Sequence, residues 1–152
     1  MARAPDELAA EIRRRAGSAT GGAWSLGTGS YGGQDAIVAV NLSVKPIDHP
    51  YCQHHLTVTV ARGTDHLAGA GEAEAERVNA AEDVLAERLV GLRGVHLGHV
   101  TRRKDRIFQF MVRDPDGSRA AAGAWASEHA VWDPRVAVTS DPSWKVRDQL
   151  GF

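Results

Sequence analysis

The chain has 152 residues, of which 43% are hydrophobic and 24% charged, a composition typical of one globular domain. Its formal net charge is -1, so the charge balance gives no overall attraction to nucleic acid or to an anionic membrane. The single cysteine, Cys52, excludes an internal disulfide, and no apolar run approaches the roughly 18 residues of a membrane span. Because the N-terminus also lacks a signal-peptide pattern, we expect a cytoplasmic protein without a membrane partner.

The N-terminal residues are predicted to stand apart from the main domain. Residues 6–16 have the pattern of a short helix, with Asp6 as its cap and Gly17 as its stop. The glycine-rich stretch that follows is typical of a flexible linker. We therefore expect a helix and linker over residues 1–22 and a single α+β domain over residues 23–152.

Three strands are predicted next, over residues 24–31, 36–44 and 56–62. In the third, Leu56, Val58 and Val60 alternate onto one face. The glycine-rich run between the first two strands lacks the Gly-Lys-Ser/Thr ending of a phosphate-binding loop, and it is better interpreted as a hairpin.

An apolar stripe at helical spacing predicts the longest helix, over residues 72–92; the stripe consists of Val78, Ala81, Leu85, Leu89 and Leu92. The acidic residues in its first turns complement the helix dipole. Strands over 95–101 and 106–113 follow, joined by a tight turn, and the sequence Asp-Pro-Asp-Gly at 114–117 predicts a second turn.

The remaining residues predict a helix, a strand and a terminal helix. Ser118 is expected to cap a helix that runs to about Ala130, and a short strand follows over 135–139. Asp141 then caps a last helix with Pro142 at its first position. From Leu56 onward, the order strand, helix, strand, strand, helix, strand predicts a ferredoxin-like βαββαβ core. We expect an antiparallel sheet extended by the N-terminal hairpin, helices packed on one face, and an open opposite face.

The stretch from about Val38 to Trp144 resembles the bacterial domain-of-unknown-function 695 family, over about two thirds of the chain. Short motifs in a fixed order carry this likeness: His-Leu-Thr-Val-Thr-Val at 55–60, Ala-Glu-Asp-Val-Leu at 81–85, Gly-His-Val-Thr at 98–101, Arg-Ile-Phe-Gln-Phe at 106–110 and Asp-Pro-Ser-Trp at 141–144. The glycine-rich hairpin turn of relatives is replaced by Arg-Arg-Lys-Asp at 102–105. The resemblance implies a layout similar to ferredoxin-like regulators, and it implies no activity, cofactor or catalytic residue.

One cluster of side chains has the chemistry of a metal site. His49, Cys52, His54 and His55 offer imidazole and thiolate groups, which are natural zinc ligands. No zinc spacing pattern is matched, and solvated loop histidines are the favoured explanation of the cluster. A cysteine nucleophile with a histidine base is a further interpretation of the same loop.

A second cluster is basic. Arg102, Arg103, Lys104 and Arg106 crowd one hairpin turn and could contact phosphate or RNA, or simply keep a sheet edge solvated. Phe108 and Phe110 on the next strand would suit RNA stacking if exposed, but the RNA-binding signature is absent, so we expect them in the core.

The tryptophans and one acidic pair complete the candidates. Trp125, Trp132 and Trp144 are candidates for an interaction surface, and we expect Trp132 or Trp144 to help dock the terminal helix. Glu82-Asp83 is expected to form an ion pair with Arg106 or Arg102.

No segment carries a catalytic signature. We therefore expect a non-enzymatic regulatory or protein-interaction module without a cofactor, which binds an unknown protein or a second copy of itself. The alternatives are a metal-binding protein or enzyme that uses the loop from His49 to His55, and an RNA-contacting regulator that uses the basic hairpin.

Overall fold

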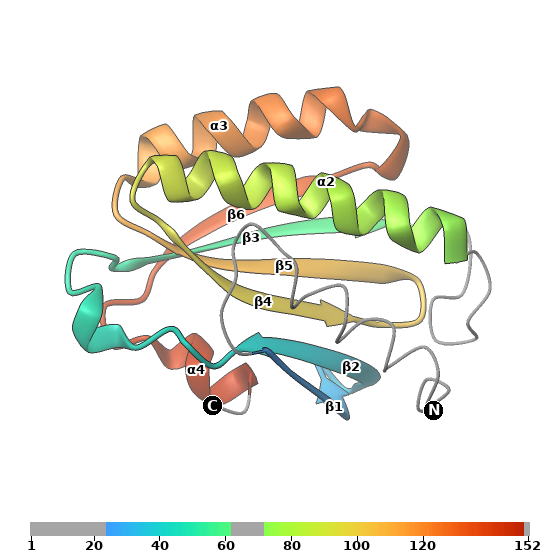
Figure 1. Ribbon diagram of the computed structural model, residues 1–152, viewed down its shortest axis with the longest axis horizontal. Helices are drawn as coiled ribbons and strands as arrows, with labels where there is room; N and C mark the ends of the chain where they lie inside the picture. Colours follow the sequence, from blue (N-terminus) through green and yellow to red (C-terminus); the bar gives the residue numbers. More distant parts are fainter. Residues whose placement is uncertain (1–23, 62–71, 151–152) are drawn as a thin grey trace.

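A six-stranded antiparallel sheet and three α-helices make up residues 24–61 and 72–150, which this computed structural model describes (Figure 1). The strands are β1 (Trp24–Tyr31), β2 (Gln34–Asn41), β3 (His54–Ala61), β4 (Val95–Thr101), β5 (Asp105–Val112) and β6 (Arg135–Ser140). The helices are α2 (Glu72–Gly91), α3 (Pro115–Glu128) and α4 (Lys145–Leu150), with short 3-10 turns η1 (Pro46–Asp48) and η3 (Ala130–Trp132). The helix expected over 6–16 lies outside the described residues. None of the described helices is long and apolar enough to cross a bilayer.

The strands lie in the order β1-β2-β4-β5-β3-β6, and every neighbouring pair is antiparallel. The α+β class is therefore confirmed. The β1–β2 hairpin extends the sheet beside β4, and a turn at Gly32-Gly33 with positive φ at both glycines joins its strands. Strand β1 has the bounds predicted from the sequence, whereas β2 ends at Asn41 and leaves Leu42 50% exposed.

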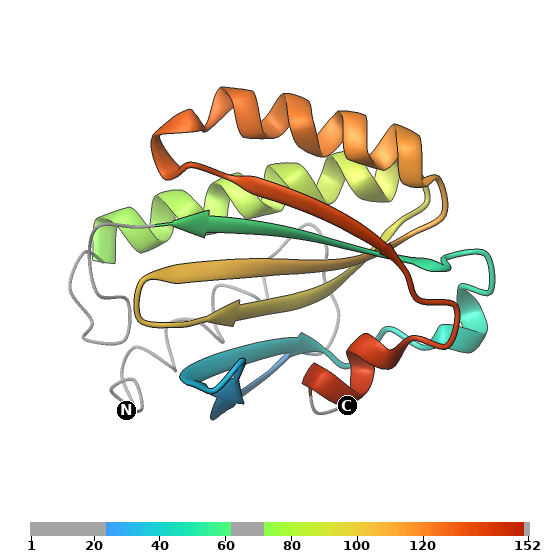
Figure 2. The same ribbon diagram turned by 180° about the vertical axis from the view of Figure 1, so that it is seen from behind.

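Helices α2 and α3 both cover one face of the sheet, as the two opposite views show (Figures 1 and 2). The strands contribute alternate residues to this core, among them Leu56, Phe108 and Phe110, and all three are fully buried. Trp125 of α3 meets Phe108 edge to face, with ring centroids 5.8 Å apart. The core position expected for Phe108 and Phe110 is thus confirmed.

The opposite face was expected to be open, and in part it is not. Helix α4 packs on this face, away from α2 and α3 (Figure 2), so the two helices of the expected core do share one face, while the terminal helix covers part of the other. The reason is that Ile107 and Met111 project apolar side chains to this side, where they share one buried cluster with Trp144, Val146 and Leu150. Trp144 therefore does dock the terminal helix.

Aspartates cap both of the later helices. For α3 the capping residue differs from the predicted one, and for α4 the first helical residue differs. Asp114 is the N-cap of α3, because its Oδ1 accepts from the N–H of Gly117 at 2.9 Å, and Ser118 is buried inside the helix. Asp141 caps α4 as expected, accepting from Lys145 N at 2.8 Å and from Val146 N at 3.1 Å. This helix nevertheless begins at Lys145, three residues after Pro142.

Candidate functional site

The four residues of the predicted metal site do not converge. His54 and His55 are neighbours in a strand and project to opposite faces of the sheet. Cys52 is buried with its Sγ 3.3 Å from the carbonyl oxygen of Arg93, and His49 stacks on Trp144 with ring centroids 6.4 Å apart. Among residues 24–61 and 72–150, no three His, Cys, Asp or Glu side chains are arranged to hold a metal ion. This loop is thus held in place by contacts to two distant segments.

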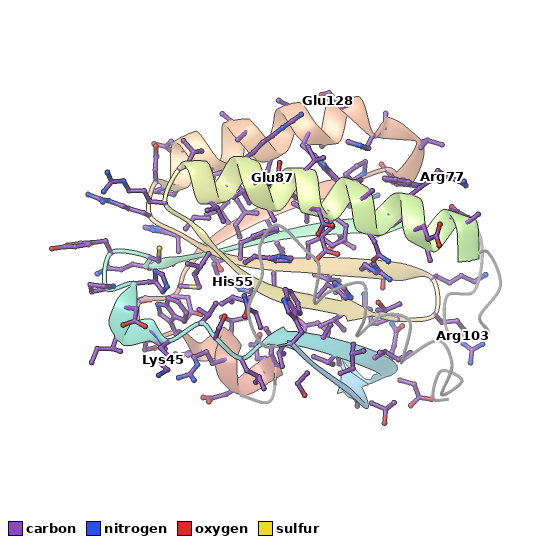
Figure 3. The ribbon with its side chains drawn as sticks, viewed as in Figure 1. Lys45, His55, Arg77, Glu87, Arg103 and Glu128 are labelled. Carbon is purple, nitrogen blue, oxygen red and sulfur yellow. The ribbon has the colours of Figure 1, made fainter. Side chains whose placement is uncertain are left out.

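The two reactive side chains of this loop have pKa values shifted by burial. Burial raises the pKa of the Cys52 thiol, and the nearby Arg113 guanidinium only partly opposes it. Burial also lowers the pKa of His55, opposed by its hydrogen bond to Gln109 and by the charge of Asp141. His55 lies below the helices (Figure 3), and its Nε2 donates to Gln109 Oε1 over 2.6 Å. A thiol with a raised pKa is a poor nucleophile at neutral pH.

The basic hairpin exposes two of its four cations. Arg102 makes a bidentate pair with Asp105, with nitrogen–oxygen distances of 2.8 and 2.6 Å, and Arg106 is only 1% exposed. Arg103 and Lys104 remain exposed at the turn, and Figure 3 shows Arg103 at this end of the sheet. The dense positive patch suggested by the sequence is therefore a smaller one.

Two of the three candidate interface tryptophans are core residues. Trp125 is fully buried and donates from Nε1 to the carbonyl of Ala81 at 2.9 Å. Trp144 is 5% exposed and donates from Nε1 to the carbonyl of Cys52 at 2.8 Å. Trp132 alone of the three keeps part of its surface exposed, beside His129.

A buried polar network lies beneath α2, and sequence reasoning found only one of its pairs. Glu82 of α2, His96 and His99 of β4 and Arg106 of β5 are each between 0% and 2% exposed. His96 Nε2 lies 2.8 Å from Glu82 Oε2, and His99 Nδ1 lies 2.9 Å from Glu82 Oε1. Arg106 lies 3.8 Å from the same carboxylate, which confirms the ion pair expected between Glu82 and Arg106.

The partners of this network are complementary in charge and in hydrogen bonding. When the Glu82 carboxylate is ionised it only accepts, so His96 Nε2 and His99 Nδ1 are then the donors. Arg106 donates in addition to Thr101 Oγ1 at 3.1 Å and to Asn79 Oδ1. A carboxylate enclosed in this way is compensated by an arginine and two imidazoles, and it holds α2 against the sheet.

A bulge in β4 explains why His96 and His99 share a face although they are an odd number of residues apart. The pairing with β5 shifts between His96 and Gly98, so the alternation of side chains restarts at that point. Gly98 has φ +149°, and a Cβ there would stand 2.0 Å from the carbonyl oxygen of Ala39. The bulge thus needs glycine, and it delivers both imidazoles to Glu82.

A third region, at the end of the sheet opposite the basic hairpin, exposes two arginines together with apolar side chains. Leu92, Arg93 and Arg113 line an open depression of about 570 Å³, where α2 ends and α3 begins. Tyr51 is 69% exposed and stands beside it, with the Arg113 guanidinium 5.2 Å from its ring centroid. We call this surface, made up of Tyr51, Leu92, Arg93 and Arg113, the arginine end.

The arginine end is fixed in place although its side chains are exposed. The Cys52 thiol contact with the Arg93 carbonyl ties the loop that carries Tyr51 to the turn after α2. Within the described part of the chain, neither Arg93 nor Arg113 forms an ion pair with a carboxylate. Asp114 also lines the depression, but its Oδ1 is engaged in capping α3. Within residues 24–61 and 72–150, the two exposed guanidinium groups thus keep hydrogen-bonding capacity that no carboxylate uses.

Comparison with protein-family models, with curated proteins and with solved structures finds no match to this chain.

Proposed function

We propose that this chain is a non-enzymatic binding module that contacts a partner protein through the arginine end. The observation that carries the proposal is the pair Arg93 and Arg113, which line one depression without a carboxylate partner among the described residues. Arginine and tyrosine are the residue types enriched at the energetic centres of protein interfaces. The exposed Tyr51 and Leu92 add the apolar area that such a centre needs.

The buried network is a weaker candidate for function than the arginine end. Glu82, His96 and His99 have the side chains of general acid–base chemistry, but each is at least 98% enclosed. A ligand reaching them would have to displace α2 from the sheet. The arginine end needs no such rearrangement, because its side chains already face solvent.

The proposal includes a fold assignment for β3 to β6. We assign these strands, with α2 and α3, to a ferredoxin-like βαββαβ unit, to which β1 and β2 are added beside β4. Support comes from the spatial order β4-β5-β3-β6, in which each helix connects two strands separated by one antiparallel neighbour. The resemblance to the domain-of-unknown-function 695 family agrees with this assignment and adds no activity to it.

The experiment is a cross-linking pull-down with full-length tagged protein in its native host. Wild type is compared with Arg93→Gln/Arg113→Gln and with the matched control Arg103→Gln/Lys104→Gln, which removes two exposed cations at the opposite end. We expect one protein to be recovered with wild type and with the control, and to be lost with the Arg93/Arg113 variant. Recovery of the same proteins with all three, or loss only with the control, would contradict the proposal.

A further inference from the structure

We infer that the partner segment at the arginine end is an acidic peptide that places an apolar side chain next to its carboxylates. This inference rests on the proposed function and specifies the partner's chemistry. Its first support is the geometry of the two guanidinium groups, which line the same depression and can each bind a carboxylate by two parallel hydrogen bonds.

The charges around the depression favour a discrete anion over a polyanion. Asp48 of η1, Asp114 at the N-cap of α3 and Asp116 in its first turn are exposed, and the start of α3 lies at the end of the sheet where α2 stops (Figure 1). A nucleic-acid backbone approaching the arginines would meet these carboxylates as well. A peptide can place one or two carboxylates on the arginines and turn away from the aspartates.

The apolar side chains around the depression favour a peptide over a free organic acid. Leu92 is 36% exposed and lines the depression, Tyr51 is 69% exposed, and Ile47 in the same loop as Tyr51 is 84% exposed. Arg113 lies against the Tyr51 ring, so that ring is less available for stacking on a base. Aliphatic side chains of a peptide would instead bury against Leu92.

Among the described residues, the turn of the basic hairpin lacks this combination. Arg102 there is neutralised by Asp105, and Arg103 and Lys104 are exposed without a large exposed apolar side chain in the same turn. The hairpin turn and the arginine end thus differ in the property that matters for an acidic and apolar segment. This difference makes the hairpin a matched control for binding.

The test uses a fluorescein-labelled dodecapeptide of serine and glycine that carries two glutamates, each next to a leucine, and measures anisotropy with the full-length protein. We expect binding that weakens about tenfold in Arg93→Gln/Arg113→Gln, weakens in about 0.5 M NaCl, and is unchanged in Arg103→Gln/Lys104→Gln. Replacing the leucines by serine, or the glutamates by glutamine, should weaken binding to wild type.

Three outcomes would overturn the inference. The first is no binding of the glutamate–leucine peptide by wild type at millimolar peptide. The second is equal binding by all three proteins. The third is tighter binding of a uridine dodecamer that depends on Arg93 and Arg113, because the ligand would then be RNA. If the pull-down still finds a protein lost with the Arg93/Arg113 variant, the binding function stands and only the partner's chemistry is wrong.

Discussion

Arginine serves opposite purposes in two regions of this molecule. Arg106 is enclosed beneath α2, where Glu82, Asn79 and Thr101 accept from it or balance its charge. Arg113 is exposed to solvent at the arginine end, where its guanidinium lies over the ring of Tyr51. The difference teaches that the positive charge within the basic hairpin sequence is partly structural, whereas the exposed charge that we propose for binding lies at the other end of the sheet.

The largest expected effect is on the buried region. Glu82→Gln removes the charge that balances Arg106 and leaves both imidazole donors facing an amide, so we expect a loss of about 3–5 kcal/mol in the free energy of unfolding. Urea denaturation measures it. Arg113→Gln is the matched control and should change stability by less than about 0.5 kcal/mol. Similar losses in the two variants would abolish the distinction between the two regions.

The second largest expected loss of stability comes from disturbing the β4 bulge, which brings His96 and His99 to Glu82. In Gly98→Ala the new Cβ would meet the carbonyl oxygen of Ala39, and we expect a loss of roughly 3 kcal/mol. Gly123→Ala is the control, because a Cβ there meets nothing within 4 Å in the interior of α3. It should gain roughly 0.5–1 kcal/mol. We expect the melting temperature to fall in Gly98→Ala and to rise in Gly123→Ala. An unchanged melting temperature in Gly98→Ala would contradict the close approach of Gly98 to the Ala39 carbonyl.

The anchoring of α4 predicts a smaller effect. Asp141→Ala removes an acceptor from two backbone N–H groups of that helix and should cost about 1–2 kcal/mol. Because Trp144 beside this helix bonds the carbonyl of Cys52, hydrogen exchange should also quicken in the loop that carries Tyr51. Faster exchange restricted to α4 would show that the arginine end is held independently of this helix.

The smallest expected effect is on how the stability of the fold depends on pH. Burial holds the pKa of His55 below 6.5 in the folded chain, so near that pH the unfolded chain binds the proton more readily. Stability should therefore fall as the pH drops through about 6.5, and the fall should be shallower in His55→Gln. Urea midpoints of both proteins at about pH 7.5 and about pH 5.5 measure it. Identical pH dependence in the two proteins would remove His55 as a contributor.

Residue patterns predicted the parts of the fold that local physics determines. The alternation of Leu56, Val58 and Val60 identified a buried strand face, and the pair Glu82 and Arg106 was expected from a motif in the sequence. The cap of α3 was misplaced because Asp114, Pro115 and Gly117 fit a turn and a helix start equally well. The position of α4 could not be predicted in this way. It depends on a cluster with Ile107 and Met111, which are distant in the sequence, so no local pattern around residues 145–150 indicates it.

The two regions of interest were largely invisible in the sequence for a related reason. In a regular strand, His96 and His99 would point to opposite faces of the sheet. The bulge at Gly98 places both side chains on the same face. The glycine within a predicted strand was the available signal. Arg93 and Arg113 are 20 residues apart and meet because β4 and β5 form a hairpin whose two outer ends lie together. To predict from the sequence that Arg93 and Arg113 lie close together, one would need to know the residues at which α2, β4 and β5 begin and end.

The most direct test of the arginine end is an amide chemical-shift titration of the full-length protein with the glutamate–leucine dodecapeptide. We expect the largest shifts at Tyr51, Leu92, Arg93 and Arg113, with the turn at Arg103 and Lys104 unaffected. Shifts concentrated at that turn, or spread evenly over the exposed cations, would contradict it.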